Sequence, residues 1–80
     1  MQPNEVKTIL DAGLTDCEVT VEGDGSHFDI VVIGDMFEGL RPVKKQQLVY
    51  AVLNEHIASG AIHAVNMQTF TPAEWQARSS

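Results

Sequence analysis

The stretch that decides the fold is residues 62–75, Ile-His-Ala-Val-Asn-Met-Gln-Thr-Phe-Thr-Pro-Ala-Glu-Trp. It begins as an apolar, strand-like run with one histidine and passes directly into the start of a helix. Thr71 can accept a hydrogen bond from the first helical turn, Pro72 has its φ angle preset for the first helical position, and Glu74 completes a capping box. We therefore predict a strand over residues 62–70, followed at once by a short helix.

The hydrophobic spacing upstream predicts two more helices and two more strands. Apolar residues recur every three or four positions in residues 3–14, which is typical of one face of a helix. Residues 17–22 alternate between apolar and polar, and residues 28–33 are almost entirely apolar, so each run predicts a strand. A glycine-rich turn at residues 23–26 joins them as an antiparallel hairpin. An apolar stripe between Pro42 and Gly60 predicts the longest helix.

The order helix, strand, strand, helix, strand, helix in 80 residues predicts one α+β domain over residues 1–80. Its three-stranded sheet carries the helices on one face. Because a whole helix separates the last two strands, they cannot form a tight hairpin, and the last strand can lie parallel to a neighbour. We assign packing roles to Phe28, Phe37, Leu53 and Trp75, the last of which packs the closing helix against the sheet.

Composition excludes several classes of protein. The only cysteine, Cys17, allows neither an internal disulfide nor a thiolate metal cage. It falls on the apolar side of its strand, so we predict a buried, inert thiol. No nucleophile with a base, paired carboxylates or metal cage is visible, so we predict that the chain is not an enzyme. No segment approaches the roughly 20 apolar residues of a membrane helix, so we predict a cytoplasmic protein without a membrane partner.

Charge leaves one question open. Eleven acidic and five basic residues give a formal net charge of −6, which repels a nucleic-acid backbone. Arg41, Lys44 and Lys45 nevertheless lie within five positions of one another. This cluster is either the solvated first turn of a helix or a contact patch for an anionic partner.

His63 also has two interpretations when only its residue type and setting are considered. A histidine in a strand is more often a hydrogen-bonded structural side chain, because buried polar groups are usually paired. The alternative is a neutral nitrogen ligand, held in place by the rigid backbone of a strand.

Several short sequence strings, taken together, resemble the BolA family over nearly the whole chain. Two longer stretches, residues 23–28 and 43–50, resemble one bacterial branch of that family. The strings that carry the resemblance are Gly25-Ser26-His27-Phe28, Phe37-Glu38-Gly39, Leu48-Val49-Tyr50, Ile62-His63-Ala64-Val65 and Thr69-Phe70-Thr71-Pro72-Ala73-Glu74-Trp75. The resemblance implies a class II KH-like fold. It also implies a monothiol glutaredoxin as partner, with a shared 2Fe-2S cluster and glutathione, in cluster trafficking or in iron, redox or stress signalling.

The resemblance also implies a ligand set. His63 stands where the family has a histidine that binds the cluster. The second ligand in the family comes from the loop between the first two strands, usually as cysteine or histidine. Residues 23–26 hold no cysteine, so Asp24 and His27 are the candidates here. Because the ligands are shared, no cluster is expected in the isolated chain.

Two alternative functions remain. A KH-like fold also implies a nucleic-acid-binding transcriptional regulator, with DNA as partner and phosphate contacts from Arg41, Lys44 and Lys45. Against it, Gln46 and Gln47 stand where the family often has basic residues, and a Gly-x-x-Gly loop is absent. The other alternative is a metal-free adaptor that docks a partner at the sheet edge or on the long helix. Monomer and homodimer both stay open.

Overall fold

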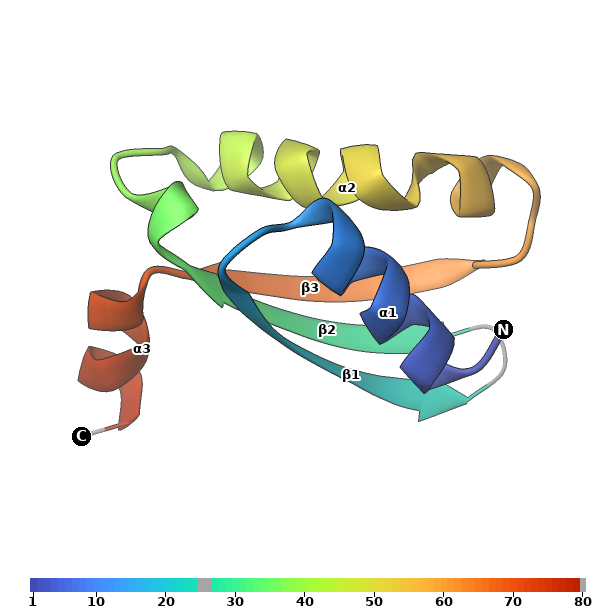
Figure 1. Cartoon of the computed structure of the whole chain (residues 1–80), viewed down its shortest axis with the longest axis horizontal. Coiled ribbons are helices and arrows are strands. Elements are labelled where there is room, and N and C mark those ends of the chain that lie inside the picture. The colour runs from blue at the N-terminus through green and yellow to red at the C-terminus, as the bar shows by residue number, and fades with distance from the viewer. Residues whose placement is uncertain (25–26, 80) are drawn as a thin grey trace.

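The computed structural model describes residues 1–24 and 27–79, without the side chains of Asp24 and Ser79 (Figure 1). The elements follow the predicted order, with one added 3-10 turn, η1. They are α1 (Pro3–Gly13), β1 (Cys17–Asp24), β2 (His27–Gly34), η1 (Asp35–Phe37), α2 (Pro42–Ala58), β3 (Ala64–Phe70) and α3 (Pro72–Ser79). None of the helices in the described part is long and apolar enough to cross a membrane.

The three strands form one sheet in the order β1-β2-β3. β1 and β2 are antiparallel, which confirms the predicted hairpin. β2 and β3 are parallel, with His27 opposite Ala64 and Ile33 opposite Phe70. The crossover through α2 is what brings the start of β3 next to the start of β2.

The helix α3 begins with the predicted capping box. The backbone N–H of Thr71 donates to Glu74 Oε1 at 2.8 Å, and the backbone N–H of Glu74 donates to Thr71 Oγ1 at 3.1 Å. Two backbone donors that the first helical turn leaves without intrahelical partners are therefore satisfied locally.

The core lies between one face of the sheet and the helices α1 and α2, which cover that face together (Figure 1). Phe28 and Phe37 are among its largest fully buried side chains, and Leu53 of α2 is completely buried as well. The packing roles predicted for these three residues are confirmed. The transfer of each such side chain from water to the core contributes about 1.5–3 kcal/mol to the stability of the folded state.

The third helix lies beyond one end of the sheet and apart from α1 and α2 (Figure 1). Trp75 contacts Phe70 edge to face, with 5.3 Å between the ring centroids. Arg78 lies over both rings. By strand alternation, Phe70 and its partner Ile33 point to the face that α1 and α2 leave uncovered. Trp75 therefore packs the closing helix against the sheet as predicted, while α3 contacts the end of the second face.

Two boundaries differ from the prediction. The last strand begins at Ala64 and not at residue 62, because the N–H of Ile62 donates to the carbonyl of His56 at the end of α2, at 3.1 Å. His63 therefore precedes the strand. In the hairpin, β1 extends through Asp24 and β2 begins at His27, so the centre of the predicted turn, residues 25–26, lies outside the described residues.

Candidate functional site

The candidate ligands come from three elements that meet at one end of the sheet. β1 ends at Asp24, β2 begins at His27, and β3 begins at Ala64, directly after His63. Asp24 is paired with His27, and His27 with Ala64. Neighbouring strands lie about 4.8 Å apart, so the fold brings together residues that are far apart in the sequence (right side of Figure 1).

His63 is exposed at this end of the sheet. Its backbone is held on both sides, because Ile62 is 2% exposed and bonded to the end of α2, and Ala64 starts the pairing with β2. Within residues 1–24 and 27–79, no hydrogen bond occupies its imidazole. A ring at the surface on a fixed backbone can present a nitrogen to an incoming metal centre.

His27 is exposed and starts β2. The backbone of β1 approaches it closely at Gly23, where φ is +146° and an added Cβ would collide with the carbonyl oxygen of His27. Only glycine accommodates both conditions. The side chain of Asp24 falls outside the described residues, so the choice between Asp24 and His27 stays a prediction.

A shallow hollow of about 220 Å³ adjoins these strand starts. It is lined by His27, Phe28 and Asp29 of β2 and by Ala64, Val65 and Asn66 of β3. Across the described chain, no three His, Cys, Asp or Glu side chains are grouped so that they could hold a metal ion. The described side chains at this end of the sheet therefore offer fewer donors than the four that an iron-sulfur cluster takes.

The cysteine lies at the opposite end of the sheet, paired with Gly34. Its side chain is half-buried against the core, and its Sγ lies 3.3 Å from Met36 Sδ. Burial, and then the nearby carboxylates of Asp16 and Asp35, raise the pKa of the Cys17 thiol. Its position on the apolar side is confirmed, although burial is only partial. Asp24 lies seven positions further along β1, about 23 Å away at the rise of an extended strand.

The three clustered cations do not act alike in the structure. Arg41 and Lys44 are exposed and line an open hollow of about 400 Å³ with Val43. Lys45 is only 8% exposed, and its Nζ lies 3.0 Å from Glu74 Oε1. Lys45 therefore does not belong to the predicted contact patch, because its ammonium group forms an ion pair that links α2 to Glu74 of α3.

Two features of the sequence are consistent with a buried, paired Lys45, and the prediction used neither of them. Lys45, Val49 and Leu53 recur every four residues, so Lys45 lies on the buried stripe of α2. Its partner is the capping residue Glu74, whose carboxylate is already fixed by Thr71. The Thr71 backbone hydrogen bond, and then the one from Lys45, lower the pKa of Glu74.

Comparisons with known proteins give consistent results. The family model for BolA, described as BolA-like protein, matches residues 2–74. Acid stress protein IbaG of Escherichia coli K12 is 49% identical over 75 residues, which cover 94% of this chain and 89% of IbaG. A BolA protein homologue from Coxiella burnetii has a TM-score of 0.85 and 36% identity, over 95% of this chain and 97% of that one. The BolA domain of SufE1 from Arabidopsis thaliana has a TM-score of 0.78 and 29% identity, over 90% and 93%.

Proposed function

This chain belongs to the BolA family, in its IbaG-like branch, and from that premise we propose that it is a non-enzymatic partner of a monothiol glutaredoxin. The two proteins share a 2Fe-2S cluster together with glutathione. The complex acts in cluster trafficking or in iron, redox or stress signalling. The name of the relative IbaG, an acid stress protein, supports the last of these roles.

The observation that carries this proposal is the position of His63. Its imidazole is exposed at the end of the sheet where β2 and β3 begin, and the backbone on both sides is fixed. A structural histidine would instead have its nitrogens occupied by the rest of the described chain. The exposed ring favours the second interpretation of this residue, a ligand for a centre that another molecule brings.

The donor set fits a shared cluster better than one held by this chain alone. A 2Fe-2S cluster takes four ligands, most often thiolates, and the single thiol of this chain, Cys17, lies at the opposite end of the sheet from His63. His63 supplies one ligand, and His27 or Asp24 supplies the second. The partner and glutathione supply the remaining thiolates.

An imidazole ligand gives such a cluster distinct properties. When bound, the cluster supplies one-electron redox chemistry, and a neutral imidazole in place of a thiolate raises its potential. The role of His63 is to hold an unprotonated nitrogen toward the iron. Because a proton competes with iron for that nitrogen, acid weakens the ligation.

The test mixes the protein with a cluster-loaded monothiol glutaredoxin and records visible absorption and circular dichroism. The wild-type chain should change both spectra, and His63→Ala should abolish or greatly reduce that change. His56→Ala is the matched control, because His56 is a half-buried histidine on α2, outside the proposed ligand set. An unchanged response in His63→Ala would remove this residue as a ligand.

The second ligand can be assigned in the same assay. His27→Ala and Asp24→Ala are compared, and the variant that alters the spectrum of the mixed complex identifies the ligand. Iron and sulfide analysis of each complex distinguishes loss of the cluster from a change in its coordination. If neither variant has an effect, the second ligand does not come from this hairpin.

Direct binding of DNA receives less support from the structure. Lys7 is paired with Asp11, Lys45 is paired with Glu74, and Arg78 lies over two aromatic rings. These contacts leave Arg41 and Lys44 as the cations best placed for phosphate in the described chain, against a net charge of −6. If DNA binding dominates, affinity falls steeply with salt, and Lys44→Ala flattens that slope by about one unit.

A further inference from the structure

The two outer strands of the sheet differ in how they protect their edges. The edge strand β1 carries Glu18, Glu22 and Asp24 within eight residues, whereas β3, Ala64–Phe70, has no charged residue and no proline. Proteins commonly place charge or proline on an edge strand, because its unpaired N–H and C=O groups otherwise bind another strand. β1 has this protection and β3 lacks it.

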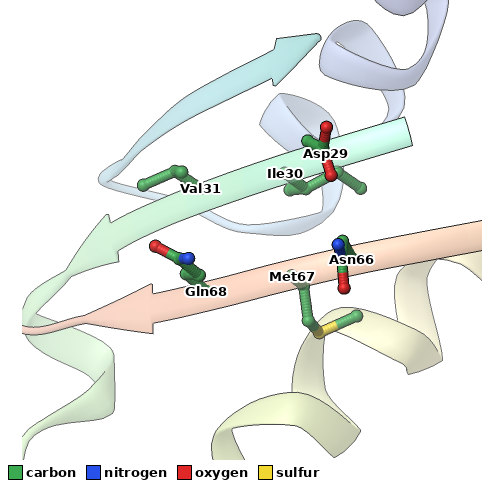
Figure 2. A pocket seen from close by; sticks show the side chains of 6 residues that line it. All are labelled: Asp29, Ile30, Val31, Asn66, Met67 and Gln68. Atoms are coloured by element: carbon green, nitrogen blue, oxygen red, sulfur yellow. The ribbon is translucent and has the colours of Figure 1, made fainter. Parts of the chain in front are cut away.

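The outer side of β3 has no strand paired with it in the described chain. The strand order is β1-β2-β3, so β2 is the only strand that hydrogen-bonds to β3 among residues 1–24 and 27–79. Asn66 and Gln68 are exposed, and Figure 2 shows them on β3 beside Asp29 and Val31 of β2, while Met67 extends toward α2. A shallow hollow of about 230 Å³ lies among these residues.

The sequence of β3 is complementary to itself when it is reversed about Met67. In an antiparallel pair centred there, Val65 faces Thr69, two β-branched residues that pair well across strands. Asn66 faces Gln68, so each carboxamide can donate to and accept from the other. Ala64 faces Phe70, which puts a small side chain opposite a large one.

We propose that β3 pairs antiparallel with β3 of a second copy of this chain, with Met67 on the two-fold axis. The product is a continuous six-stranded sheet in which α2 of both copies lies on the same side. Each copy carries a net charge of −6, so two copies repel one another over most of their surface. The uncharged edge of β3 is where they can meet without opposing carboxylates.

This association is expected to be weak. A strand of seven residues spans about 23 Å, and an interface of this length is below the standard size of a permanent dimer. The exchange between monomer and dimer therefore depends on concentration. The proposal is independent of the cluster and is tested without glutaredoxin.

The test is sedimentation equilibrium of the cluster-free protein from about 10 µM to about 1 mM, the range that suits a small interface. Two double variants differ only at position 68, and both change exposed side chains. In Asn66→Lys with Gln68→Lys, lysines face each other across the two-fold axis, so association should be about tenfold weaker. In Asn66→Lys with Gln68→Glu, each lysine faces a glutamate, so association should equal or exceed that of the wild type.

The control is Thr20→Lys, an exposed position on the protected strand β1, which should leave the association constant unchanged. A wild-type chain that stays monomeric throughout the concentration range would overturn the proposal. So would a dimer that the two lysines at 66 and 68 do not weaken, because it would form through another surface.

Discussion

At one end of the sheet, β2 and β3 begin and two histidines lie at the surface, whereas at the other end β1 begins and Cys17 lies half-buried against Met36. Thiolate is the usual ligand of an iron-sulfur cluster. The thiol of Cys17 is held in its protonated form by burial and by Asp16 and Asp35. An imidazole binds metal in its neutral form and needs no such ionisation. The comparison teaches that the surroundings of a side chain, and not its type alone, determine whether a donor atom lies at the surface in the form that binds metal.

Each end of the sheet has one position at which the structure requires glycine, and the physical reason differs between the two. Gly23, at the histidine end, has φ of +146° and lies against the backbone of His27. Gly34, at the cysteine end, has φ of −166°, an extended conformation that any residue adopts. Its missing Cβ instead leaves room for the Cys17 sulfur. The four predictions that follow alter one end at a time.

Gly23→Ala should have the largest effect. The substitution adds backbone strain and drives a Cβ into the His27 carbonyl, so the free energy of unfolding should fall by at least about 2 kcal/mol. It should also displace His27 and reduce the spectral change on mixing with loaded glutaredoxin. Urea titration measures the first effect.

The matched control for this change is Gly39→Ala. Gly39 has φ of +76°, and nothing lies within 4 Å of an added Cβ. The Gly39→Ala variant should lose only about 1 kcal/mol of unfolding free energy, from backbone strain alone. Equal losses in the two variants would mean that the close approach of β1 and β2 is not what requires Gly23.

Gly34→Ala should destabilise the cysteine end by about 1–3 kcal/mol, because the new methyl group overlaps the Cys17 sulfur. Adding Cys17→Ala removes that sulfur and should restore most of the loss. Urea titration of the two single variants and the double variant measures this coupling. Cys17→Ala alone should leave the glutaredoxin-dependent spectrum unchanged, and a lost spectrum would contradict the assignment of the ligands to the histidine end.

The thiol of Cys17 should react slowly with iodoacetamide near neutral pH. The thiolate is the reacting species, and the raised pKa keeps its population low, so alkylation should be several-fold faster after unfolding in urea. Asp16→Asn should accelerate the reaction of the folded protein modestly. Asparagine tolerates the positive φ of 59° at this position, so the variant tests charge without disturbing the backbone. Equal rates before and after unfolding would contradict the raised pKa.

The smallest effect belongs to Glu74, which joins α3 to α2. Its pKa is lowered in the folded state, so its contribution to stability is present at neutral pH and is lost in acid, as the pH falls through the lowered folded value. Glu74→Gln should therefore flatten the fall of unfolding free energy below about pH 5. Urea titrations across that range measure the slope, with Glu38→Gln as an exposed control. Identical slopes would show that the Lys45–Glu74 contact does not contribute.

Much of the fold follows from local patterns in the sequence. Local patterns identified the three α-helices and the three strands of the described chain but not the 3-10 turn η1, and the capping pair Thr71 and Glu74 marked the start of α3 correctly. The beginning of β3 was wrong by two residues, because the Ile62 N–H bonds to the His56 carbonyl at the end of α2. That hydrogen bond joins two elements, so no local pattern contains it.

The candidate site also has a part that the sequence predicted and a part that it did not. His63 was identified by resemblance, and the structure adds its exposure and its position next to the start of β2. Lys45 was grouped with its basic neighbours, although its four-residue spacing from Val49 and Leu53 indicated the buried stripe. The partner that makes a buried lysine tolerable, Glu74, lies 29 residues away, a distance that composition and periodicity do not bridge.

The parallel pairing of β2 with β3 also determines when the two histidines first meet. Along the chain, β2, η1 and α2 lie between His27 and His63. The pairing of two parallel strands so far apart in sequence is slow, because a long connection must close first. The pairing of β2 with β3 is therefore what creates a surface with both histidines, and it is complete only in the finished domain.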